Sequence, residues 1–118
     1  MLHEDTKSQL PECAPGDHPE RARVKIPDRA FAGAVSLFKA LSDEQRLRTL
    51  AFLSEAEACA SEIAGYFDEP LSTVSHRMKL LEGAGLVARR RAGRHVFFRL
   101  LDRHVLNLVH DALEHAQE

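Results

Sequence analysis

The chain has 118 residues, of which 44% are hydrophobic, and its formal net charge is −2. This length suits one small domain, at a size where assembly into a dimer helps stability. No apolar run reaches the roughly 18 residues that a membrane span needs, and the polar start lacks the order of a signal peptide, so we expect a cytoplasmic protein with no membrane partner.

Charge is distributed unevenly along the chain. Between residues 72 and 99 seven lysines and arginines accompany a single acid, Glu82. The segment 102–118 carries four acids and one arginine. A basic middle suits phosphate, and an acidic end suits cations.

Helical patterns begin after a proline-rich start. Residues 1–27 hold four prolines and show no helical period, which predicts a mobile N-terminal arm, and residues 28–118 are expected to form one folded domain. A first helix is predicted from Asp28 to near Ser42, with apolar residues at helical spacing. Ser42 or Asp43 caps a second helix, "EQRLRTLAFLSEA", and a short third runs through "CASEIAGYF".

A fourth helix and a hairpin follow. In "DEPLSTVSHRMKLLEGAG" a proline fits the first helical turn and two glycines mark the end. Its expected apolar stripe is Leu71, Val74, Met78 and Leu81. The segment "LVARRRAGRHVFFRL" alternates on either side of Ala92-Gly93, which predicts a β-hairpin with arginines near its tip.

The last seventeen residues, "DRHVLNLVHDALEHAQE", are expected to form a fifth helix. Together these elements predict a mainly α fold with a small β-hairpin wing, a winged helix-turn-helix of order α-α-α-α-β-β-α. The fourth helix would enter the major groove of double-stranded DNA, and the wing would touch backbone or minor groove. The expected DNA contacts are Ser72, Thr73, Ser75, His76, Arg77 and Lys79 on the helix, and Arg89, Arg91, Arg94 and His95 on the wing. An ordinary solvated helix face is the alternative for the fourth helix. The alternative for His76 is a structural role, in which it holds the helix by a hydrogen bond.

The segments "LSDEQRLRTLAFL", "LSTVSHRMKLLEGAGLV" and "GRHVFFRL" resemble the ArsR/SmtB family of bacterial metal-sensing repressors over roughly residues 30–118. The terminal D-x-H-x10-H-x2-E looks like the zinc site of the SmtB-type subgroup. The resemblance implies a homodimer, joined through its N- and C-terminal helices, that binds an inverted-repeat operator without metal and is released by Zn(II). It also implies control of genes that export or sequester the metal.

Helix geometry independently supports a metal site formed by Asp102, His104, His115 and Glu118. At 100° per residue His104 and His115 share one face, but eleven residues separate them by about 16 Å, so one helix cannot close the site. Along the sequence, the midpoint between the two histidines is 109.5 and the midpoint between the two acids is 110. If two copies of this helix pack antiparallel, they form two sites with a donor set that suits zinc or cobalt. An ordinary solvated surface is the alternative.

A second candidate metal site comprises Cys13, His18, Cys59 and Glu62, and it resembles the thiolate site of some family members. Cadmium and lead sensors carry Cys-x-Cys where this chain has Cys59-Ala60-Ser61, which weakens a soft-metal reading, although Cd(II) stays a possible ligand. A plain buried thiol is one alternative for Cys59. A repressor switched by oxidation of Cys13 and Cys59 is another.

An enzyme is not expected. Four protein ligands would close the zinc shell, whereas a zinc hydrolase keeps one coordination position open. The sequence holds neither H-E-x-x-H nor G-x-S-x-G. We therefore expect no small-molecule substrate.

Overall fold

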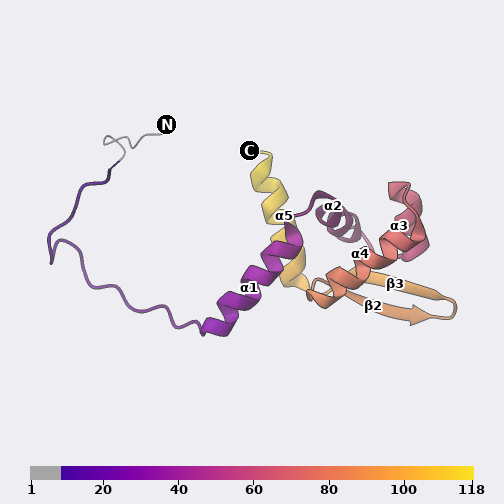
Figure 1. Ribbon diagram of the computed structural model, residues 1–118, viewed down its shortest axis with the longest axis horizontal. Helices are drawn as coiled ribbons and strands as arrows, with labels where there is room; N and C mark the ends of the chain where they lie inside the picture. Colours follow the sequence, from indigo (N-terminus) through magenta and orange to yellow (C-terminus); the bar gives the residue numbers. More distant parts are fainter. Residues whose placement is uncertain (1–8) are drawn as a thin grey trace.

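The computed structural model describes residues 9–118, which contain five helices and three strands. Figure 1 labels the helices and the two strands of the hairpin. The helices are α1 (Asp28–Leu41), α2 (Glu44–Leu53), α3 (Ala60–Phe67), α4 (Leu71–Gly83) and α5 (Arg103–Ala116), and the strands are β1 (Ala58–Cys59), β2 (Val87–Ala92) and β3 (His95–Leu100). Residues 9–27 are exposed and extend away from the folded part. Within the described residues no helix is long and apolar enough to cross a membrane.

Side-chain caps fix the start of two helices. The carboxylate of Asp43 accepts a hydrogen bond from the backbone N–H of Arg46 at 2.9 Å, and Asp102 accepts one from Val105 at 3.0 Å. Each bond satisfies a backbone donor that the first turn leaves unpaired. Of the two expected caps for α2, Asp43 is the one observed.

The sheet is antiparallel with the order β1-β3-β2. Ala92 pairs with His95, so the two-residue turn is Gly93-Arg94, and the predicted turn at Ala92-Gly93 is wrong by one residue. Gly93 has φ +61°, as a type II′ turn requires at its first central residue. Strand β1 was not predicted, because two residues carry no visible alternation; Cys59 therefore precedes α3 rather than lying inside it.

One apolar core joins the helices to the sheet. Its fully buried large side chains include Leu50, Ile63, Val74, Met78, Leu81, Leu86 and Val109. Leu71, predicted in the apolar stripe of α4, is 54% exposed because it lies at the outer end of that helix. The arrangement is a winged helix-turn-helix, as predicted, with the β2–β3 hairpin projecting from the end opposite α1 and α5 (Figure 1).

Candidate nucleic-acid interface and metal centre

Helix α4 presents a polar face to solvent. Ser72, Thr73, Ser75, His76 and Lys79 are all exposed. The apolar residues at intervening positions are buried on the opposite side of the helix. Short hydroxyl side chains with a histidine and a lysine are able to donate and accept hydrogen bonds at base edges and phosphates.

Arg77 is not part of that face, and its prediction as a DNA contact is wrong. Only 7% of the residue is exposed. Its Nη2 donates to Glu69 Oε2 at 2.5 Å, and its Nη1 donates to Thr49 Oγ1 at 3.2 Å. The position lies between the core positions Val74 and Met78, and the guanidinium pairs there with Glu69, whose side chain is 17% exposed.

The Arg77 contacts tie α4 to two other elements. Glu69 lies in the turn between α3 and α4, and Thr49 lies on α2, where its hydroxyl donates to the carbonyl of Gln45 at 2.8 Å. The hydrogen bond from Arg77 holds the pKa of the Glu69 carboxyl below its usual range. Glu69 is therefore ionised at neutral pH, as a buried arginine requires.

The wing arginines fall into two groups. Arg91, Arg94 and His95 are exposed at or beside the turn. Arg89 is also exposed in part, but it donates three hydrogen bonds of 2.8–3.1 Å to the carboxylate of Glu82, at the end of α4. Arg90, which was not among the expected DNA contacts, pairs with Glu57.

The predicted metal ligands form two pairs at opposite ends of α5. His104 Nδ1 lies 3.8 Å from Asp102 Oδ1, and His115 Nδ1 lies 3.6 Å from Glu118 Oε1. The side chains of the two histidines are 97% and 87% exposed. In residues 9–118 no three His, Cys, Asp or Glu side chains of one chain come together as metal ligands.

The second predicted site is not assembled within one chain. Cys13 lies on the extended arm, away from α3, and both cysteines are free thiols. Cys59 is half-buried, and its Sγ lies 3.3 Å from Ser61 Oγ. This hydrogen bond, with backbone N–H groups of α3, lowers the pKa of the Cys59 thiol.

Comparison with known proteins shows which family this chain belongs to. Residues 43–89 match the model of the arsR family of bacterial regulatory proteins. A transcriptional repressor SmtB homolog of Synechocystis sp. is 40% identical, over 93% of this chain and 87% of its own length. The chain belongs to the ArsR/SmtB family. This family consists of metal-responsive transcriptional repressors, so the protein is a DNA-binding regulator and not an enzyme.

Two further relatives of this ArsR/SmtB protein extend the comparison. A cadmium resistance transcriptional regulatory protein CadC homolog of Staphylococcus aureus is 33% identical, over 86% of this chain and 85% of its own length. The homodimeric winged helix-turn-helix domain of a possible ArsR-family regulator from Mycobacterium bovis superposes with a TM-score of 0.75 at 25% identity. That superposition covers 84% of this chain and 92% of the other.

Replacing Arg77 of this ArsR/SmtB protein with methionine should lower the free energy of unfolding by about 3 kcal/mol at neutral pH, because Glu69 would stay buried without its partner. The Glu69 pKa is lowered in the folded state. The stabilisation by the Arg77–Glu69 pair is therefore present at neutral pH and is lost as the pH falls through the lowered pKa of Glu69. Urea unfolding at one protein concentration, near pH 7 and near pH 3, measures both effects.

Arg48→Met is the matched control, because Arg48 forms an exposed pair with Glu44 on α2. It should cost no more than about 0.5 kcal/mol. A loss below about 1 kcal/mol for Arg77→Met would show that the buried pair does not anchor α4.

Proposed function

We propose that this chain represses transcription as a metal-free homodimer on an inverted-repeat operator in the cytoplasm, and that Zn(II) binding at two intersubunit sites releases the DNA. The observation that carries the proposal is the division of Asp102, His104, His115 and Glu118 into two exposed pairs at the ends of α5. Each pair offers one imidazole and one carboxylate, which is half of a tetrahedral zinc shell.

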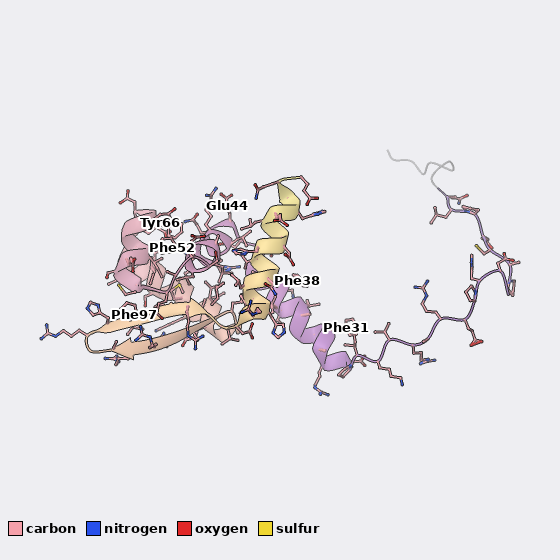
Figure 2. The ribbon with its side chains drawn as sticks, turned by 180° about the vertical axis from the view of Figure 1, so that it is seen from behind. Phe31, Phe38, Glu44, Phe52, Tyr66 and Phe97 are labelled. Carbon is pink, nitrogen blue, oxygen red and sulfur yellow. The ribbon has the colours of Figure 1, made fainter. Side chains whose placement is uncertain are left out.

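An exposed apolar stripe on α1 supports the dimer. Phe31, Val35 and Phe38 recur at steps of four and three residues and are 54–55% exposed in the single chain. Figure 2 shows Phe31 and Phe38 along α1, at the end of the domain that also holds α5. A second copy of the chain would cover this stripe and bring a second α5 close to the first.

The two half-sites complete each other under twofold symmetry. Eleven residues separate His104 from His115, which is about 16 Å along a helix, whereas zinc lies about 2 Å from each ligand. If two α5 helices run antiparallel about a point near residue 110, His104 of one chain meets His115 of the other. Asp102 then meets Glu118 in the same way, and each dimer has two sites.

The donor set and its exposure fit zinc, and cobalt or cadmium are further metal ions that such a site could bind. Asp102 also caps α5 through Oδ1, and a carboxylate has a second oxygen with which it is able to bind a metal. Histidine ligands orient their other ring nitrogen toward a fixed partner, which gives a route from the metal to the protein frame.

For DNA we propose contacts from the exposed face of α4 and from the tip of the wing. The set is Ser72, Thr73, Ser75, His76 and Lys79, with Arg91, Arg94 and His95. Arg89, which the sequence predicted as a contact, is left out because it pairs with Glu82. Helix residues read base edges in the major groove, while arginines on a projecting hairpin neutralise phosphates or enter the minor groove.

A second candidate switch involves Cys13 and Cys59, with His18 and Glu62 as further possible ligands. The lowered pKa of the Cys59 thiol favours it, since a thiolate is the form that binds soft metals and reacts with oxidants. Metal binding by a variant with both cysteines changed to serine separates the candidates. The terminal-helix sites should still take up to two zinc ions per dimer, whereas a cysteine switch should no longer respond.

Arg94→Ala should weaken binding to operator and random DNA alike and reduce the salt dependence of the affinity by about one phosphate contact per wing. Arg94 occupies the exposed turn, so it carries no packing role that would confuse the result. Fluorescence anisotropy over a salt series measures the slope. Arg48→Ala on α2 is the control, and an Arg94 variant with an unchanged slope would remove that residue from the interface.

His104→Ala and His115→Ala should each bind the operator like the parent protein but no longer release it when zinc is added. Zinc releases DNA only if it binds the DNA-incompetent dimer more tightly. Operator titrations with and without zinc measure the effect. His110→Ala is the control, because it removes an exposed histidine of the same helix outside the proposed ligand set.

The same coupling must appear in the reverse experiment. If zinc lowers DNA affinity by a factor between about 5 and about 150, operator DNA must lower zinc affinity by the same factor. The regulatory site would lie at the cysteines instead if both histidine variants still released DNA on zinc addition and Cys59→Ser did not.

A further inference from the structure

The five arginines of the wing do not all face solvent freely. Arg89 and Arg90 lie in the body of β2, opposite Phe98 and Phe97 of β3, while Arg91 and Arg94 lie nearer the turn. Arg99 donates to the backbone carbonyls of Leu100 and Leu101 instead of to an acid.

Arg89 is held by both the edge and the face of its guanidinium. Its Nε and Nη2 donate to the Glu82 carboxylate, and its Cζ lies 5.3 Å from the centre of the Phe98 ring. A two-point arginine–carboxylate contact is stronger and more directional than a single ion pair. This pair also joins the wing to the C-terminal end of α4.

Arg90 is held in the same manner on the other face of the hairpin. It pairs with Glu57, and its Cζ lies 4.8 Å from the centre of the Phe97 ring. The hydrogen bond lowers the pKa of Glu57 and raises that of Arg90, so both groups are charged at neutral pH. Figure 2 shows Phe97 on the hairpin.

We propose that Glu57 and Glu82 are internal counter-ions that take the place of DNA phosphates on Arg90 and Arg89, and so set an upper limit on the sequence-independent affinity of the wing for DNA. The inference rests on the proposed DNA-binding role of the wing and assigns its phosphate contacts to Arg91 and Arg94. Specific recognition benefits, because affinity from phosphates is shared by every sequence in the genome.

Glu57→Gln and Glu82→Gln test the proposal in the zinc-free, full-length protein. Each should raise the affinity for a mixed-sequence duplex of about 30 base pairs and steepen the salt slope by about one contact per wing. Between about 50 and about 200 mM salt, each added contact should increase the loss of affinity roughly three- to fourfold. Glu44→Gln has the same change in net charge but frees Arg48 on α2, and it should leave the slope unchanged.

Variants of the two arginines, alone and combined with an acid variant, test the same assignment. Arg89→Gln and Arg90→Gln alone should leave the slope as it is, and Arg90→Gln combined with Glu57→Gln should cancel the gain from the latter. A fall of about one contact for either single arginine variant would overturn the proposal, because that arginine would already bind phosphate. Unchanged slopes for both Glu57→Gln and Glu82→Gln, or a lower DNA affinity of these two variants, would overturn it as well.

The result is separable from the proposed zinc response, because no metal enters the experiment. Parent protein that binds no duplex at low salt would overturn the DNA-binding role and this inference together. Parent protein that binds DNA but ignores zinc would overturn only the metal switch.

Discussion

A buried guanidinium without a partner is too costly for a domain of this size, so the position of Arg77 requires the position of Glu69. The pair spans the α3–α4 turn, and the second contact of Arg77 reaches Thr49 on α2. These contacts hold α4 against α2 and against the turn before it, and so orient its polar face. The helix that we propose to read DNA therefore depends on a buried arginine outside that face.

The arginines of the wing differ in role from Arg77, and from one another, because their surroundings differ. Glu82 and Glu57 engage Arg89 and Arg90 over aromatic rings, whereas the turn leaves Arg94 exposed. If the wing binds DNA as we propose, a count of cations in the basic segment overstates the charge available to phosphates. What matters for phosphate binding is the number of cations without an acidic partner.

The C-terminal helix combines two requirements through its length. Its N-terminal cap, Asp102, stabilises the first turn and also belongs to a proposed metal half-site. The second half-site, at His115 and Glu118, lies too far along the helix for one ion to join them. A metal bound by both pairs would therefore report how two subunits are placed, which is the quantity that a DNA-binding dimer has to control.

The sequence alone determined the features that depend on neighbours along the chain: the five helices from their apolar period and caps, the hairpin from its alternation, and the spacing of the four proposed metal ligands along and beside α5. The tertiary structure decided the burial of Arg77, the pairing of Arg89 and Arg90, and the addition of β1 to the sheet. These depend on contacts between residues up to tens of positions apart, such as Thr49 with Arg77 and Glu57 with Arg90. Local periodicity shows which face of a helix is polar, but only packing decides whether a charged side chain on its border finds a buried partner or solvent.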